Sequence, residues 1–170
     1  MTPRASVPVH RLRGNASEWT PPALLALDTE SRWTTLGSLE QHKLRLWSAL
    51  TTVRRSSAAT PPAPLWGRGT TVDELCEYIE RAARGLSTLW VVTHNLGFDL
   101  ALTRLPDALG RAGWQAQEQS LSPGAPWLRL GRGSKRLTFI DSFTWLPIAL
   151  ADVGELVGIA KPPLPADDDS

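Results

Sequence analysis

The sequence predicts a three-layer α/β domain built around a central mixed β-sheet. Two short apolar runs, residues 23–27 and 89–93, have the composition of strands buried on both faces. Segments with helical apolar spacing follow the predicted strand at residues 43–53 and the apolar run at residues 89–93. Shorter segments that could form strands come after them. The chain has 170 residues, 42% hydrophobic and 21% charged, which is sufficient for one domain with a substantial core.

The first strand is expected at residues 23–27, which follow Pro21 and Pro22 and stop at Asp28. A helix of that length would be too short to be stable alone. Residues 43–53 alternate imperfectly and predict a second strand. Residues 54–69 are rich in Ser, Ala, Pro and Gly, so we expect an exposed loop there.

A helix is expected to begin after Thr71, a suitable N-cap with acidic residues in the following turn, and to end at Gly85. Residues 89–93 form the next predicted strand. Residues 97–112 then carry helical apolar spacing, and Pro106 is expected to kink this helix or divide it in two.

Three short strands are expected at residues 114–120, 127–130 and 136–141, and the glycine-rich residues 131–135 form a hairpin turn between the last two. Residues 146–157 predict a final helix that ends at Gly158. The expected organisation is a loose leader at residues 1–20, one domain at residues 21–160, and a Pro- and Asp-rich tail at residues 161–170.

Composition narrows the class of protein. No apolar run approaches the roughly 20 residues of a membrane span, and the N-terminus lacks the apolar core of a secretory signal. A single cysteine, Cys76, excludes a disulfide framework and a cysteine-rich zinc site, and favours an intracellular, cytoplasmic location. The net charge of +1 does not by itself indicate a nucleic-acid-binding protein. We expect most of the eight tryptophans to pack in the interior.

Asp28 and Glu30 are the first candidate functional residues. Residues two apart on a strand point to the same face, so the two carboxylates should converge and repel each other. Divalent cations would neutralise them, and hard oxygen ligands suit Mg²⁺ or Mn²⁺. The alternative is a solvated strand end whose acids cap a neighbouring helix or bind arginine.

A second polar group follows the other apolar run, in the segment His94-Asn95-Leu96-Gly97-Phe98-Asp99. Asn95 and Asp99 are four residues apart and share one face if a helix starts there. Taken singly, Asn95 can be an N-cap and Phe98 a core contact. These simpler roles do not explain why both apolar strands of one sheet end in acidic residues.

Asp-Thr-Glu after one apolar strand and His-Asn-x-x-Phe-Asp after another resemble the first two exonuclease motifs of the DEDD superfamily. The likeness is to the proofreading domains of family B DNA polymerases, including the protein-primed phage and organellar type. The stretch from Phe139 through Ser142, followed by Leu146-Pro147 and a helix, is similar to the segment that precedes the last motif of those domains. The resemblance covers roughly residues 23–169 and implies a ribonuclease H-like fold.

The resemblance implies a 3′–5′ exonuclease acting on the 3′ end of single-stranded DNA. Asp28, Glu30 and Asp99 would be three of four carboxylates that hold two Mg²⁺ or Mn²⁺ ions about 4 Å apart. One ion would activate a water and the other would stabilise the leaving 3′-oxygen. The positions at which the family binds the substrate strand are Thr29, Asn95 and Phe98.

The fourth acid of the family lies in a Tyr-x-x-x-Asp or His-x-x-x-x-Asp motif, which we do not find. Tyr78, the only tyrosine, falls in the wrong helix and is not followed by Asp four residues on. We therefore expect the last motif to be absent from this chain, and metal binding and activity to be weakened. A polymerase domain in a parent protein is an expected partner.

Two other polar groups are candidates. Basic side chains cluster around the predicted hairpin and can guide a phosphate backbone, although a solvated basic turn is the better explanation; they are Arg129, Arg132, Lys135 and Arg136. Asp141 also follows an apolar strand, but its counterpart in the family does not bind metal, so we expect a structural role.

Two hypotheses of different classes remain at this point. The first is a metal-dependent exonuclease, of a polymerase or free-standing. The second is a non-catalytic ribonuclease H-like remnant that binds single-stranded nucleic acid or a partner protein. A related enzyme that trims RNA is a third reading, because discrimination of the 2′-hydroxyl depends on the shape of the pocket.

Overall fold

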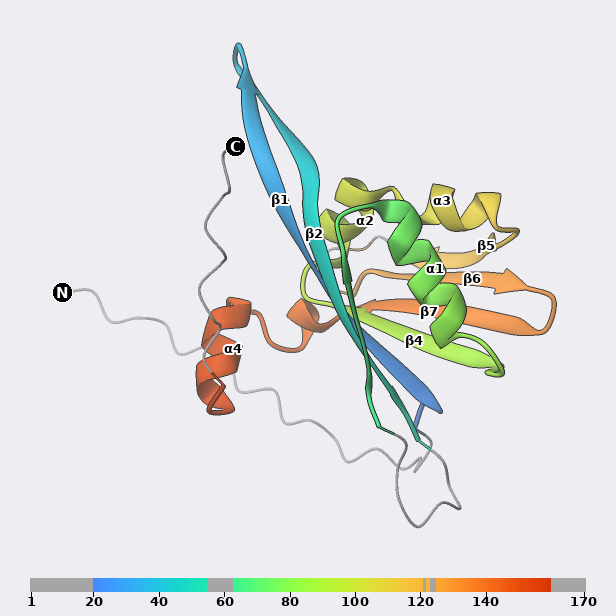
Figure 1. Ribbon diagram of the computed structural model, residues 1–170. Helices are drawn as coiled ribbons and strands as arrows, with labels where there is room; N and C mark the ends of the chain where they lie inside the picture. Colours follow the sequence, from blue (N-terminus) through green and yellow to red (C-terminus); the bar gives the residue numbers. More distant parts are fainter. Residues whose placement is uncertain (1–19, 55–62, 121, 123–124, 160–170) are drawn as a thin grey trace.

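The central feature of the computed structural model, which describes residues 20–54, 63–120, 122 and 125–159, is a seven-stranded sheet (Figure 1). The strand order is β3-β2-β1-β4-β7-β6-β5. Strands β1, β4 and β7 run parallel to one another, whereas the other pairings are antiparallel, so the sheet is mixed. The strands are β1 (Ala23–Leu36), β2 (Leu39–Val53), β3 (Leu65–Gly69), β4 (Thr88–Thr93), β5 (Gln115–Ser120), β6 (Trp127–Arg132) and β7 (Lys135–Asp141).

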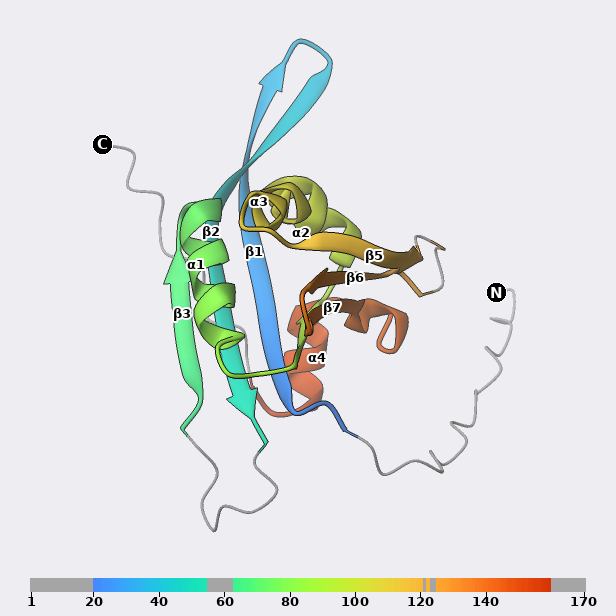
Figure 2. The same cartoon turned by 90° about the vertical axis from the view of Figure 1, so that its right-hand side faces the viewer.

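Helices flank the sheet on two sides. One side carries α1 (Val72–Ala82), α2 (Leu96–Thr103) and α3 (Leu105–Arg111), and α4 (Leu150–Leu156) lies on the opposite side (Figures 1 and 2). This three-layer α/β arrangement confirms the expected fold class and is compatible with a ribonuclease H-like fold.

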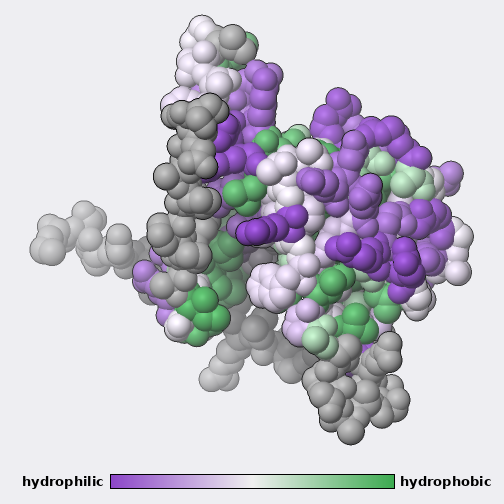
Figure 3. Space-filling view, viewed as in Figure 1, coloured by the Kyte–Doolittle hydropathy of each residue, from purple (hydrophilic) through white to green (hydrophobic). Residues whose placement is uncertain are grey.

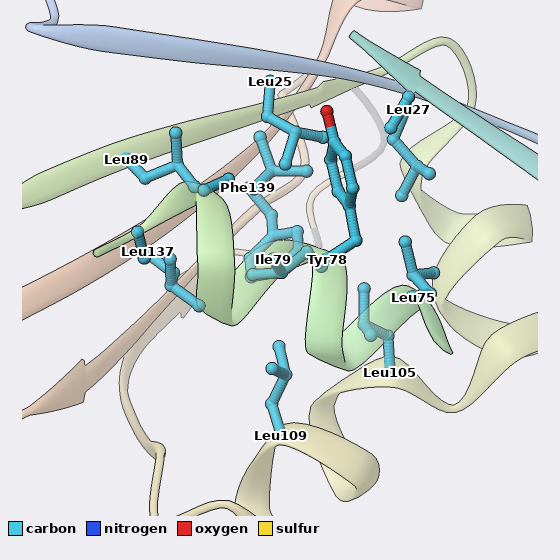
Figure 4. Close-up of a cluster of buried hydrophobic side chains, with 14 of the residues drawn as sticks. Leu25, Leu27, Leu75, Tyr78, Ile79, Leu89, Leu105, Leu109, Leu137 and Phe139 are labelled. Atoms are coloured by element: carbon cyan, nitrogen blue, oxygen red, sulfur yellow. The ribbon is translucent and has the colours of Figure 1, made fainter. Parts of the chain in front are cut away.

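The hydrophobic core lies between the sheet and the α1–α3 layer (Figure 4). Leu25 and Leu27 of β1 pack there with Leu75 and Ile79 of α1. Leu24, the neighbour of Leu25, is 39% exposed on the other face. The expectation that this strand is buried on both faces was therefore wrong, because the short helix α4, which has no buried residues, leaves the second face partly open.

Strand β1 does not end at Asp28, as its apolar run had suggested. It continues to Leu36 and forms a long hairpin with β2, which begins at Leu39. The β-branched and aromatic residues beyond Glu30 suit an extended chain. Gly37, with φ of +66°, supplies the positive φ that a two-residue hairpin turn favours.

The expected loop at residues 54–69 contains a strand, β3, at its end. Residues 55–62 lie outside the part that the structure describes. Tyr78 explains why β3 holds its place: its hydroxyl donates to the carbonyl of Leu65 at 2.5 Å and lies 3.0 Å from the Thr51 hydroxyl. A Cβ on Gly67 would lie 2.3 Å from the Tyr78 ring, so only glycine permits this approach. In this segment, which the sequence predicted to be a loop, Gly67 instead allows β3 to pack closely against Tyr78 of α1.

The helix boundaries agree with the sequence in part. Thr71 caps α1 in a complete capping box with Glu74, as its position suggested. The segment 97–112 is divided at Arg104, whose φ is +48°, so Pro106 stands in the first turn of a new helix.

The last helix starts four residues later than predicted, at Leu150, after a 3-10 turn at Ser142–Thr144 and Pro147. The predicted leader (residues 1–20) and tail (residues 161–170) lie outside the described part, apart from Thr20. Within that part, no helix has both the length and the apolar character that a membrane span requires.

Candidate functional site

The candidate site lies where β1 and β4 separate. Pairing between these parallel strands ends at Ala26 and Val92, while β1 stays paired with β2. Asp28 lies just beyond the last pair on β1, and Thr93 and His94 lie just beyond it on β4. The polar residues that follow the two apolar runs are thus brought to one opening in the sheet.

Asp28 and Glu30 occupy one face of β1, and both are half-buried. Asp28 lies opposite Ser48 of β2 and lines a pocket of about 510 Å³ on the α4 side of the sheet. A β-bulge follows directly between Glu30 and Ser31. Bulges often redirect side chains beside functional sites, and this one changes the path of the strand next to the second carboxylate.

Thr29 and Asp99 meet on the opposite face of β1. The Thr29 hydroxyl donates to Oδ1 of Asp99 at 2.5 Å, and the side chains are 7% and 6% exposed in turn. Burial raises the pKa of Asp99 to about 6; the Thr29 hydrogen bond opposes this rise and the negative charge of Asp28 adds to it. Asp28 and Asp99 are therefore close enough to interact electrostatically, although they approach from different faces.

The buried hydroxyl of Thr93 adds an unusual feature. It is close enough to Asp99 to favour the charged carboxylate, yet it makes no hydrogen bond of standard geometry within the described residues. Buried polar atoms are rarely left without a partner, and those that are often mark a functional site. Thr93 is also one of the residues around the pocket that Asp28 lines.

The residues at this opening fit a divalent cation in kind but not yet in arrangement. Carboxylate oxygens are the ligands that Mg²⁺ and Mn²⁺ prefer. Within residues 20–54, 63–120, 122 and 125–159, however, no three His, Cys, Asp or Glu side chains are close enough together to hold one ion. Asp28, Glu30 and Asp99 must come closer together than they lie here to share a cation.

Asp141 supports the segment that carries Asn95, Phe98 and Asp99. Its carboxylate accepts hydrogen bonds from the backbone N–H groups of Asn95 and Leu96, each at 3.1 Å, and of Phe143 at 2.8 Å. The Asn95 side chain makes no capping bond to α2, so the distant Asp141 replaces it. The structural role expected for Asp141 is confirmed.

Asn95 and Phe98 remain accessible beside the carboxylates. Asn95 has a φ of +127°, a region that costs a non-glycine residue about 1–3 kcal/mol and often occurs at functional sites. Phe98 is 36% exposed and packs edge-on against the His42 ring, with ring centroids 5.9 Å apart. Phe98 is therefore not a core residue.

His94 was part of the recognised motif but had been given no role. Its Nε2–H donates to the carbonyl of Ile148 at 2.7 Å, and its Nδ1 lies 3.0 Å from the Ser142 hydroxyl. Ser142 also donates to the carbonyl of Thr93. His94 thus ties the end of β4 to the segment before α4. Its position directly after the strand was the only sequence signal.

Two of the four basic residues around the β6–β7 hairpin, Arg129 and Arg132, have acidic partners. Arg129 pairs with Glu118 at 2.7 Å, and Arg132 pairs with Glu80 at 2.6 Å while stacking 4.5 Å from the centre of the Trp114 ring. These contacts favour the simpler reading of the basic cluster over a path for phosphates.

No protein-family model matches the sequence, and none of the curated proteins matches it. Among solved structures, the chain is similar to Phi29 DNA polymerase complexed with primer-template DNA, with a TM-score of 0.53 and 13% sequence identity. The match covers 86% of this chain but 25% of that one, so the chain spans about a quarter of the polymerase's length. At this identity the similarity extends to the fold, and the shared architecture is an α/β sheet domain found in a DNA polymerase.

Proposed function

We propose that this chain is a metal-dependent 3′–5′ exonuclease-type domain that acts on the 3′ end of single-stranded DNA. The observation that carries the proposal is that Asp99 is hydrogen-bonded to Thr29, the residue next to Asp28, just beyond the point where β1 and β4 separate. Asp28 of β1 and Asp99 of α2 approach this point from opposite faces of the sheet, and the repulsion between their charges would be relieved by a cation. The fold similarity to a DNA polymerase bound to DNA supports a nucleic-acid substrate.

Asp28, Glu30 and Asp99 would hold Mg²⁺ or Mn²⁺. When bound, such ions would supply an activated water and stabilisation of the leaving 3′-oxygen. Thr29 orients Asp99 through its hydrogen bond, and the accessible Asn95 and Phe98 would contact the terminal nucleotides. With three acids matched to the four of the family, we expect binding of the ions and turnover to be weak.

A non-catalytic single-strand-binding domain is the second candidate. It is favoured by the absence, among the described residues, of three acidic or histidine side chains gathered around one point. In this case Asn95 and Phe98 would still contact the strand, and the acids would carry no ion.

An assay with 3′-labelled single-stranded DNA and Mn²⁺ separates the two functions. We expect the wild-type chain to release labelled nucleotide, the Asp28→Ala variant to lose this activity, and Glu77→Gln, which changes an exposed acid on α1, to retain it. Binding of the DNA without metal-dependent release would establish the non-catalytic function instead. Equal release by Asp28→Ala and the wild type would reject the proposed site.

A further inference from the structure

The β1–β2 hairpin extends well past the sheet and its helices (Figures 1 and 2). Its two strands stay paired up to Leu36 and Leu39. A hairpin that leaves the core gains little from burial, and isolated two-stranded hairpins are marginal in water. Because the extension adds little to stability, its exposed side chains are candidates for a role in binding.

Three aromatic rings connect the hairpin to the candidate site. Phe98, one position before Asp99, packs edge-on against His42 at 5.9 Å with an interplanar angle of 85°. Trp33 lies directly opposite His42 in the strand register, so the two side chains stand next to each other on one face of the hairpin. The rings thus run from the first turn of α2 to β2 and then across the hairpin to β1.

These three rings remain accessible, and the central one, His42, is held by neighbouring side chains. Trp33 is 63% exposed, Phe98 36%, and the His42 side chain 41%. The Ser31 hydroxyl lies 3.1 Å from Nδ1 of His42, which limits rotation of that ring. A single exposed aromatic residue needs no explanation, but three neighbouring ones beside a candidate catalytic carboxylate do.

The charge of the hairpin matches a nucleic acid. Between Ser31 and Leu46 the sequence has three basic residues and one acidic residue, Glu40. In Figure 3, hydrophilic surface follows one edge of the hairpin and the region beside it, and one of the hydrophobic patches lies over α4, where Leu156, Val157 and Ile159 are exposed. A protein partner held by apolar contacts would fit the α4 side better than the hairpin. Aromatic faces combined with positive charge are typical of single-strand binding surfaces.

We propose that Trp33 and His42 extend the surface of Phe98 into a stacking platform for the bases of single-stranded DNA that enters the candidate site. The inference rests on the proposed function and adds two residues that the motif resemblance does not include. Every base has a stacking face, so the platform would bind without sequence preference. The platform would hold the DNA strand at a distance from the carboxylates and so guide its 3′ end toward them.

The test is binding of a 5′-fluorescein-labelled oligothymidylate, followed by fluorescence anisotropy in EDTA so that no cleavage takes place. Trp33→Leu and Trp33→Phe form the decisive pair, since both keep an apolar side chain and only the second keeps a ring. We expect Trp33→Leu to raise Kd roughly 5- to 150-fold, the range for loss of one stacked base, and Trp33→Phe to stay within a few-fold of the wild type. His42→Leu is expected to weaken binding as well.

Leu39→Ala is the matched control, because Leu39 is 72% exposed on the same hairpin but has no ring. Wild-type affinity in Trp33→Leu, or equal losses in Trp33→Leu, Trp33→Phe and Leu39→Ala, would overturn the platform while leaving the exonuclease proposal intact. Failure of the wild-type chain both to bind and to trim single-stranded DNA would overturn the two proposals together. Urea unfolding of each variant checks that the hairpin substitutions leave the domain folded.

Discussion

The hydroxyl of Thr29 donates a 2.5 Å hydrogen bond to the carboxylate of Asp99, and both side chains are more than nine-tenths buried. Thr29 points to the helical face of β1, whereas its neighbours Asp28 and Glu30 point to the other face. The three consecutive residues of the Asp-Thr-Glu motif thus have two kinds of surroundings. Asp28 and Glu30 face the α4 side of the sheet, which is partly open. Thr29 faces the α1–α3 side, where it holds Asp99 by a hydrogen bond.

Replacement of Thr29 by valine should destabilise the domain at alkaline pH. The ionised Asp99 would lose its only hydroxyl donor of standard geometry among the described residues, at a cost of about 1–3 kcal/mol. At pH 4.5 the loss should be smaller, because Asp99 is then largely protonated. Urea unfolding at the two pH values measures the difference. Thr35→Val, an exposed change on the same strand, should have little effect, and a loss equal at both pH values would contradict this explanation.

The raised pKa of Asp99 predicts a fall in stability with rising pH. The unfolded carboxyl loses its proton near pH 3.8, while the folded one keeps it to about pH 6. The stabilisation is therefore complete below about pH 4 and is lost as the pH rises through about 6, by on the order of 1–3 kcal/mol. Asp99→Asn should remove this fall and be more stable than the wild type at pH 8. Urea unfolding of both proteins in EDTA at several pH values tests this prediction. Identical pH profiles of stability for the wild type and Asp99→Asn would contradict it.

Asp141→Asn should weaken the junction between β4 and α2. The carboxylate accepts three backbone hydrogen bonds, and an amide cannot accept on its nitrogen. We expect a loss of about 1–2 kcal/mol, the size of a lost helix cap, and faster amide exchange at Leu96. Hydrogen exchange and urea unfolding measure both effects. Asp152→Asn, which changes an exposed acid of α4, serves as the control. Unchanged exchange at Leu96 would mean that the cap contributes nothing.

Two glycine substitutions should have opposite effects. Gly67→Ala places a Cβ 2.3 Å from the buried Tyr78 ring, so we expect a loss of about 1–3 kcal/mol from overpacking. Gly110→Ala, in α3, meets no atom within 4 Å and should gain up to about 1 kcal/mol through higher helix propensity. Thermal or urea unfolding compares them. Equal stability of the two variants would refute the close contact between β3 and α1.

The sequence was most informative where local rules and burial agree. The apolar runs located β1 and β4, and Thr71 with Glu74 marked the start of α1 through a capping box that needs no distant contact. The extension of β1 past Asp28 could not be recognised, because an exposed hairpin lacks an apolar pattern. Strand β3 was missed since its place depends on Tyr78, which follows it on another element.

The candidate site shows the same division. Strand alternation correctly suggested that Asp28 and Glu30 share a face, because the rule is local. It could not show that Asp99 would hydrogen-bond to Thr29 on the other face. That contact depends on how α2 packs against the sheet. Most tryptophans were expected in the interior, yet Trp33, Trp66 and Trp145 are more than 60% exposed. Residue type alone does not reveal which aromatic side chains remain on the surface.

Binding of Mn²⁺ to the metal-free chain, followed by electron paramagnetic resonance of the unbound ion, tests the proposed carboxylate site most directly. We predict a saturable site in the wild type whose affinity falls roughly tenfold or more in Asp28→Asn, since a charged oxygen ligand is lost. Glu77→Gln should bind Mn²⁺ as the wild type does. Absence of saturable binding, or equal affinity in the wild type and Asp28→Asn, would contradict a metal site at Asp28, Glu30 and Asp99.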